Sequence, residues 1–123
     1  MIAIDTSALI RYLSGIEDRA TVAVHSAMQM KGATLPPVVL SELLSNPELP
    51  QAMRRDILEL RRLDIHPGYW ERAGDLRASL LRNRLKAKLA DCLIAQSCID
   101  NDAPLITYDR DFRHFERAGL RVI

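Results

Sequence analysis

The sequence predicts an α/β fold built on a parallel sheet. Short apolar runs that are typical of buried strands alternate with longer stretches in which apolar residues recur at helical spacing. No two runs are joined by the short glycine or asparagine turn of a β-hairpin. Parallel strands require crossover connections, and the helical stretches supply them. The 123 residues make a common domain size, so we expect one domain over residues 1–123.

The first half of the chain has clear element boundaries. Gly15 ends the first helix and Gly32 follows the second, as helix C-termini prefer. Pro36 and Pro37 end the second strand, and Pro37 suits the first turn of the next helix, where its missing N–H costs nothing. We expect, in chain order, a strand at 1–4, helices at 6–13 and 17–31, a strand at 33–35 and a helix at 38–45.

The second half repeats the alternation with longer helices. Its first helix carries one apolar stripe, which consists of Met53, Ile57, Leu60 and Leu63. Gly119 closes a short helix near the end. We expect helices at 51–63, 69–85, 90–100 and 110–118, and strands at 64–67, 105–107 and 120–123.

The composition excludes several classes of protein. The formal net charge is +1, so nucleic acid or a membrane surface would have to be bound by a local patch. Asp5 interrupts the apolar run at the N-terminus, which argues against a signal peptide. No stretch reaches the length of a membrane span. Cys92 and Cys98 are interpreted as small buried residues, not as a disulfide. We therefore expect a soluble cytoplasmic protein.

Four acids are placed where a parallel sheet would collect them. Asp5 and Asp109 each follow an apolar strand, and we expect these strands side by side, where the strand order reverses. Glu42 lies in the helix after the second strand, so it can reach the same edge. Asp91 begins the helix that leads into the strand at 105–107. It reaches this edge if the helix at 69–85 returns the chain there.

Each acid also has an ordinary structural interpretation. Asp5 and Asp109 can cap the helices that follow them, and the helix dipole favours Asp91 near a helix N-terminus. Glu42 can belong to a solvated helix face. The joint interpretation differs, because converging carboxylates repel by a few kcal/mol per pair at about 4 Å. A fold holds such a cluster by protonating some members or by binding a cation.

The chemistry of this cluster indicates a hard metal ion. Carboxylates without cysteine or histidine partners suit Mg²⁺ or Mn²⁺, and a metal ion held by acids commonly acts on phosphate esters. The glycines are scattered, which excludes a glycine-rich phosphate loop. Neither a Gly-x-Ser-x-Gly nor a His-Glu-x-x-His motif is present. His25, His66 and His114 have no ligand spacing.

A run of basic residues leads into Asp91. Between Asp75 and Asp91 the chain has no acid, and its bases are Arg77, Arg82, Arg84, Lys86 and Lys88. A solvated helix face and loop explain most such runs. Beside an acidic metal site, the same run would hold the phosphates of a nucleic acid. Arg110 and Arg113 would add to it.

Four segments resemble, in order, the acidic motifs of the PIN-domain ribonucleases. They are residues 4–7 (Ile-Asp-Thr-Ser), 41–43 (Ser-Glu-Leu), 90–95 (Ala-Asp-Cys-Leu-Ile-Ala) and 107–112 (Thr-Tyr-Asp-Arg-Asp-Phe). The Asp-Thr-Ser opening and the chain length are most similar to the VapC-type toxins of bacterial toxin–antitoxin pairs. The resemblance implies a three-layer α/β/α sandwich with a central parallel sheet of four to five short strands.

The resemblance also implies roles for individual residues. The catalytic metal ligands for Mg²⁺ or Mn²⁺ would be Asp5, Glu42, Asp91 and Asp109. The supporting residues would be Thr6, Ser7, Thr107 and Asp111, with Asp111 as an outer or second-metal ligand. Family members cut RNA with metal-activated water, often form homodimers and are silenced by a cognate antitoxin. Ala90 and Gln96 depart from the residues expected beside the third motif, so the resemblance does not define the shape of the pocket around Asp91.

Two other functions are compatible with the sequence. A catalytically silent PIN-like module that binds RNA or a protein partner would carry the same motifs. A phosphatase with a nucleophilic aspartate after the first strand would match Asp5. That chemistry uses a second aspartate two residues later, where Ser7 stands.

Overall fold

Four short strands form one parallel sheet. The computed structural model describes residues 1–123, and its sheet has the order β3-β2-β1-β4. The strands are β1 (Ile2–Ile4), β2 (Ala33–Leu35), β3 (Arg61–Arg62) and β4 (Leu105–Ile106). Ala3 lies opposite Thr34 on one side and Leu105 on the other. The chain moves outward from β1 to β3 and then returns to the other side of β1. The strand order therefore reverses between β1 and β4, as predicted.

Six α-helices and one 3₁₀-helix connect and cover these strands. They are α1 (Thr6–Leu13), α2 (Arg19–Gln29), α3 (Pro37–Leu44), α4 (Gln51–Glu59), α5 (Tyr69–Arg82), α6 (Leu89–Asp100) and the 3₁₀-helix η1 (Arg110–Ala118). Each helix is too short or too polar to cross a membrane. Together with the sheet, the helices form the predicted three-layer α/β/α sandwich.

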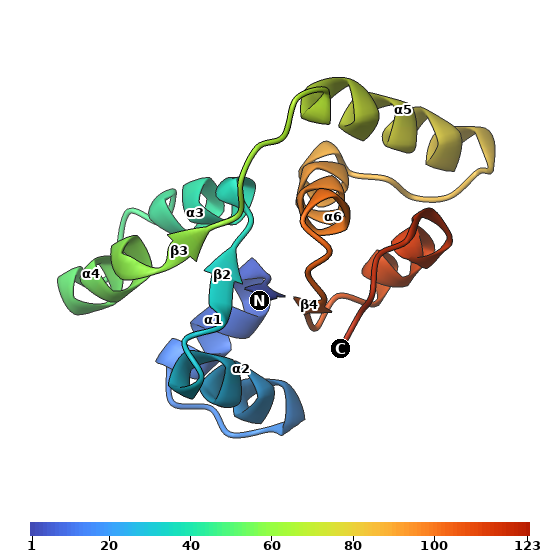
Figure 1. The fold of residues 1–123 in the computed structure, drawn as a ribbon. Helices are drawn as coiled ribbons and strands as arrows, with labels where there is room; N and C mark the ends of the chain where they lie inside the picture. The colour runs from blue at the N-terminus through green and yellow to red at the C-terminus, as the bar shows by residue number, and fades with distance from the viewer.

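The helix α6 lies in the middle of the helical packing. Figure 1 shows it between α5 and η1, and it contacts both of them as well as α3. On another side of the sheet, α2 contacts β2 and β4. Because α6 is enclosed by several elements, it buries more residues than any other helix, which explains why its sequence lacks a single apolar stripe.

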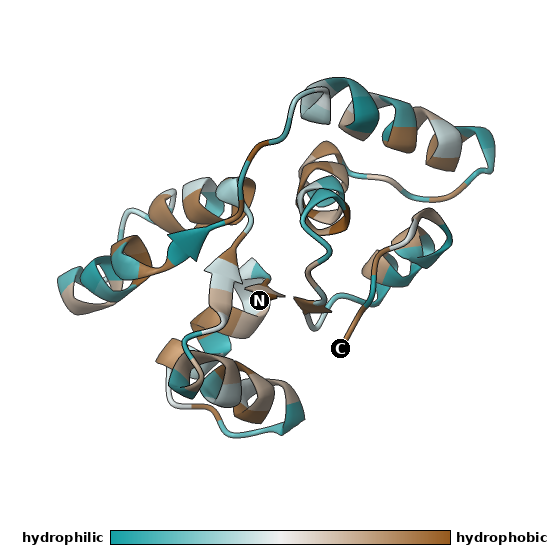
Figure 2. Cartoon of the chain, viewed as in Figure 1, coloured by the Kyte–Doolittle hydropathy of each residue, from teal (hydrophilic) through white to brown (hydrophobic).

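The buried interior comes from every part of the chain. Figure 2 shows brown, apolar segments turned toward the centre and teal segments on the outer helix faces. Ile4, Leu35 and Leu105 are fully buried strand residues at the centre of one cluster of 24 buried apolar side chains. Cys92 and Cys98 belong to the same cluster and are free thiols. Both are buried, as predicted, and burial raises the pKa of Cys98 to about 12.

The structure corrects four element assignments. The helix α4 ends at Glu59, and the third strand is Arg61–Arg62, not residues 64–67. Two exposed arginines carry no apolar strand signal, yet their backbone pairs with β2, and the Leu63 amide donates to the Leu35 carbonyl at 2.9 Å. The expected last strand is reduced to a single bridge between Leu105 and Val122. The predicted helix at 110–118 is a 3₁₀-helix.

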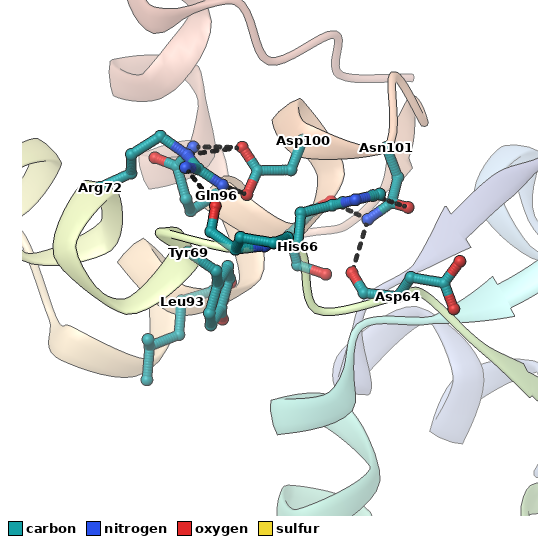
Figure 3. Close-up of polar contacts among 10 residues, drawn as sticks. Asp64, His66, Tyr69, Arg72, Leu93, Gln96, Asp100 and Asn101 are labelled. Carbon is teal, nitrogen blue, oxygen red and sulfur yellow. Dashed lines mark hydrogen bonds and ion pairs between the residues drawn. The ribbon is translucent and has the colours of Figure 1, made fainter.

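A polar network fastens α5 and the segment before it onto α6 (Figure 3). The Arg72 guanidinium donates to both carboxylate oxygens of Asp100, at 3.1 and 2.6 Å, and Gln96 donates to the same carboxylate at 2.9 Å. The Tyr69 hydroxyl donates to the Leu93 carbonyl at 2.7 Å. These contacts fix the helix that carries Asp91.

Candidate active site

Asp5 is the buried centre of the candidate site. It follows β1 directly, and its backbone amide donates to the Ile106 carbonyl of β4 at 3.0 Å. Only 6% of Asp5 is exposed. One carboxylate oxygen accepts from the Thr6 amide at 2.7 Å, which caps α1. The other accepts from the Thr107 hydroxyl at 2.7 Å and, over a longer 3.4 Å, from Ser7. Asp5 is therefore a helix cap and a site residue at once.

Glu42 reaches the same place from α3. Its carboxylate accepts a hydrogen bond from the Thr6 hydroxyl at 2.8 Å, although 36 residues separate the two. Thr6 thus contacts both acids, because its amide binds Asp5 and its hydroxyl binds Glu42. The Glu42 residue is exposed, in contrast to Asp5.

Asp91 and Asp109 lie near these two acids. Asp91 is half-buried in the first turn of α6. Asp109 follows β4, caps η1 and accepts from the Asp111 amide at 2.8 Å, while its own amide donates to the Thr107 hydroxyl at 3.0 Å. Thr107 therefore connects the first acid to the fourth. Asp111 lies in the first turn of η1 and contributes its backbone amide.

The electrostatics show that the four carboxylates act on one another. Burial raises the pKa of Asp5, and the charges of Glu42 and Asp109 raise it further, against hydrogen bonds from Thr107 and Thr6 that lower it. Burial, followed by the charges of Asp109 and Asp5, raises the pKa of Asp91 to about 6, although Lys88 opposes the shift. None of the four carboxylates forms an ion pair with a basic side chain. The sheet edge therefore concentrates negative charge that the protein leaves unneutralised.

The donor set at this edge fits a hard cation in its chemistry. It consists of carboxylate and hydroxyl oxygens, with no imidazole beside them. No three acidic, histidine or cysteine side chains are close enough to share one ion in this arrangement. Binding an ion at this edge would therefore require some carboxylates to rotate about their side-chain torsions.

The predicted basic residues fall into two separate groups. One group lies at the end of α5 and on the connection to α6, where Arg82, Arg84, Lys86 and Lys88 are exposed. In the same group, the Arg77 side chain donates from its Nε to the Ala87 carbonyl at 2.9 Å and so supports this connection. The second group, Arg110 and Arg113, is exposed on η1, next to Asp109.

The contacts around Tyr108, the residue before Asp109, were not found from the sequence. Arg11 of α1 lies over the ring of Tyr108, 4.3 Å from its centroid, and forms a 3.0 Å ion pair with Asp18. Tyr108 and the Thr21 amide hold the pKa of Asp18 well below its usual range. The Asp18-x-x-Thr21 capping box is visible in the sequence. Nothing local indicates that Arg11 lies between Asp18 and Tyr108.

The sequence matches the family model of the PIN domain over residues 2–118. The chain belongs to the PIN-domain family. The match runs from β1 to the end of η1, so it includes all four acids of the candidate site. The predicted family is confirmed. No match was found among curated proteins.

Solved structures show the same PIN-domain fold over the whole chain. One is VapBC2 from Rickettsia felis bound to a DNA fragment from their promoter, with 21% identity, a TM-score of 0.76, and coverage of 100% of this chain and 98% of that chain. Another is FitAcB from Neisseria gonorrhoeae, with 16% identity, a TM-score of 0.72, and coverage of 100% and 96%. At these identities the comparison establishes the fold.

Proposed function

We propose that this PIN-domain protein is a metal-dependent endoribonuclease that acts in the cytoplasm as the toxin of a toxin–antitoxin pair. The supporting observation is the group of mutually interacting carboxylates Asp5, Glu42, Asp91 and Asp109 at one sheet edge, with no basic side chain paired to any of them. Burial and mutual repulsion disfavour the ionised form of these acids, so a cation bound among them would relieve that cost.

The four carboxylates are the proposed ligands for Mg²⁺ or Mn²⁺. A divalent ion bound there supplies positive charge to the phosphate and lowers the pKa of water, so that hydroxide is available near neutral pH. Thr107 donates to the Asp5 carboxylate and Thr6 to that of Glu42, so each of these acids has a hydroxyl partner that supports it. Ser7 is a weaker support for Asp5, since its hydrogen bond is 3.4 Å long. We assign Asp111 an outer position beside Asp109.

The proposed substrate is RNA held by local basic residues, since the net charge of +1 supplies no general attraction. The exposed basic residues between α5 and α6 precede Asp91 and would contact the RNA strand on that side of the site. Arg77 supports the connection between α5 and α6. Arg110 and Arg113 would contact the RNA beside Asp109. The proposed partners are a cognate antitoxin and a second copy of the chain. The names VapBC2 and FitAcB of the similar structures support the antitoxin proposal.

The decisive experiment is cleavage of labelled RNA by the purified full chain. We expect cleavage with Mg²⁺ or Mn²⁺, none with a chelator, and a loss of about a hundredfold or more in Asp5→Asn and Asp91→Asn. Asparagine retains the capping ability of Asp5, so the variant separates charge from folding. Asp75→Asn, at an exposed position of α5, is the matched control. Cleavage that survives chelation, or full activity in both variants, would contradict the proposal.

A catalytically silent binding module is the second candidate. The observation in its favour is that no three potential ligands are grouped closely enough to hold an ion as the side chains lie. Such a module would retain RNA or a protein partner and leave RNA ends intact under all metal conditions. The aspartate-nucleophile phosphatase has no supporting contact, because Ser7 stands where the second aspartate would be required.

A further inference from the structure

A continuous hollow lies beside Asp109, outside the carboxylate group. It runs from the start of α2 across the segment after β4 to η1, and two adjoining parts of about 540 and 510 Å³ share six lining residues. These residues define what we call the arginine hollow: Arg19, Thr107, Tyr108, Arg113, Val122 and Ile123. Ala20 and Ala23 extend its apolar floor at one end, and Asp109 and Arg110 border the other.

Three arginines and three acidic residues line this hollow, and one of the acids is already paired with Arg11 from outside it. Arg19, Arg110 and Arg113 are all exposed, and none of them is in an ion pair. Asp18 also lines the hollow, but its carboxylate is engaged by Arg11 at 3.0 Å and by the Thr21 amide at 2.9 Å. Glu116 and Asp109 are the remaining acidic side chains of the lining. Three free guanidinium groups around one hollow are suited to bind phosphate oxygens.

The position of Arg19 is fixed by a contact between distant elements. Arg11 is held between the Asp18 carboxylate and the Tyr108 ring. This contact joins the first residue before α2 to the segment that follows β4, so it keeps Arg19 on the same side as Asp109. The fold therefore places the backbone of Arg19 on the side of the sheet edge where η1 carries Arg110 and Arg113.

The hollow shares a wall with the carboxylate site. Thr107 lines both parts of the hollow, while its hydroxyl donates to Asp5 at 2.7 Å and accepts from the Asp109 amide at 3.0 Å. An RNA strand that continued from the carboxylates past Asp109 would enter the hollow directly. A separate hollow of about 610 Å³ between α1, α2 and α4 lacks this connection and is lined mainly by apolar side chains.

We propose that the arginine hollow binds the sugar-phosphate backbone of single-stranded RNA next to the phosphate that is cut, with Arg19 and Arg113 on the phosphate oxygens. This inference rests on the proposed nuclease function and adds a substrate site to it. Arg110 borders the end nearest the carboxylates, and the apolar floor by Ala20 and Val122 receives the sugar or base. The exposed bases between α5 and α6 would contact the strand on the other side of the cut.

The test measures RNA binding separately from cleavage. Fluorescence anisotropy with a labelled single-stranded oligouridylate, in the presence of chelator, compares the full chain with the double variant Arg19→Ala/Arg113→Ala over a range of salt concentrations. The matched control is Arg54→Ala/Arg55→Ala, which removes two exposed arginines from α4, beside the opposite edge of the sheet. Thermal melting checks that each variant is folded.

We expect the double variant to bind about tenfold or more weakly and to lower the salt slope by about 0.7 for each arginine removed. The control should bind as the unchanged protein does. In the cleavage assay, the double variant should raise KM and leave kcat nearly unchanged, because these contacts are equal in the ground and transition states. A labelled single-stranded DNA of matching sequence tests whether the hollow reads the backbone phosphates alone.

The outcomes separate this inference from the nuclease proposal. Arginine-dependent binding without any cleavage supports the hollow and contradicts the nuclease. Metal-dependent cleavage with unchanged binding and KM in the double variant overturns the hollow and leaves the nuclease intact. The inference is also overturned if the unchanged protein does not bind the RNA, if the control loses as much affinity, or if only DNA binding depends on the two arginines.

Discussion

Acidic residues at two places in this protein have opposite electrostatic surroundings. Desolvation acts to raise the pKa of Asp100 on α6, but hydrogen bonds from Arg72 and Gln96 and the charge of Arg72 outweigh it, so the pKa lies below its usual value. At the carboxyl edge of the sheet, burial and neighbouring acids raise the pKa of Asp5 and of Asp91 instead. The same residue type thus occupies a neutralised environment in Figure 3 and an unneutralised one beside β1.

The difference separates an acid that the protein itself neutralises from acids that it leaves without a paired cation. The Asp100 cluster is complete within the protein, because every charge in it has a partner, and it joins two helices. The carboxylate site is incomplete, since three of its four acids accept from hydroxyl or amide donors and none of the four has a paired basic side chain. An arrangement that raises pKa values is retained where a ligand completes it. Asp100 and Asp91 both lie on α6, so the contacts that fasten Asp100 also position Asp91.

Breaking the neutralised cluster should have the largest effect on stability. Arg72→Met leaves the Asp100 carboxylate, whose side chain is 9% exposed, without its charged partner. We expect a loss of about 1 to 2 kcal/mol in the free energy of unfolding, below the range for fully buried pairs because Arg72 is itself partly exposed. Urea denaturation measures this loss. Arg55→Met, on an exposed site of α4, should change stability by less than about 0.5 kcal/mol.

The two clusters should respond to pH with opposite signs. Asp91 has a folded pKa of about 6, above the ordinary aspartate value of 3.8, so between these values the folded state holds a proton that the unfolded chain has lost. Its contribution to stability is therefore lost as the pH rises through this window. Asp100, with its lowered pKa, loses its contribution as the pH falls into the acid range.

Metal-free unfolding curves at pH 4.5 and pH 7 test this sign. Asp91→Asn should reduce the fall in stability between the two pH values, and Asp75→Asn should not change it. An equal fall in the unchanged protein and in Asp91→Asn would show that Asp91 is not the group responsible.

A divalent ion should complete the carboxylate site and stabilise the fold. Mg²⁺ at about ten times its dissociation constant should add about 1.4 kcal/mol, since it binds the folded state alone. Differential scanning fluorimetry of the unchanged protein and of Asp5→Asn, with Mg²⁺ and with chelator, measures the shift. No shift at millimolar Mg²⁺, or the same shift in Asp5→Asn, would show that these acids do not share an ion.

The smallest expected effect concerns the threonine that holds the exposed acid. Thr6→Val removes the hydroxyl that donates to Glu42 but keeps the backbone amide that binds Asp5. We expect unfolding to change by about 0.5 kcal/mol or less, and metal affinity to fall by less than about tenfold. Thr107→Val should have the larger effect on affinity, because its partner Asp5 is buried. Calorimetric titration with Mn²⁺ ranks the two.

Much of the fold was predictable because its signals are local. Capping at Asp18 and the αL glycine at the end of η1 are visible within a few residues, and these helices end within two residues of the predicted limits. β3 was misplaced because Arg61 and Arg62 have no apolar signature and form a strand only through pairing with β2. The placement of Asp91 required α5 to return the chain, which depends on contacts between α5 and α6.

The sequence by itself determined the order of most elements, the family, and the four acids in its motifs. Only the tertiary structure decided which groups meet: Thr6 with Glu42 across 36 residues, Thr107 with Asp5 across 102 residues, and Arg11 between Asp18 and Tyr108. Local propensities act over about one helical turn. The order of strands in a sheet is settled by burial of the whole chain, and that order brings these side chains together.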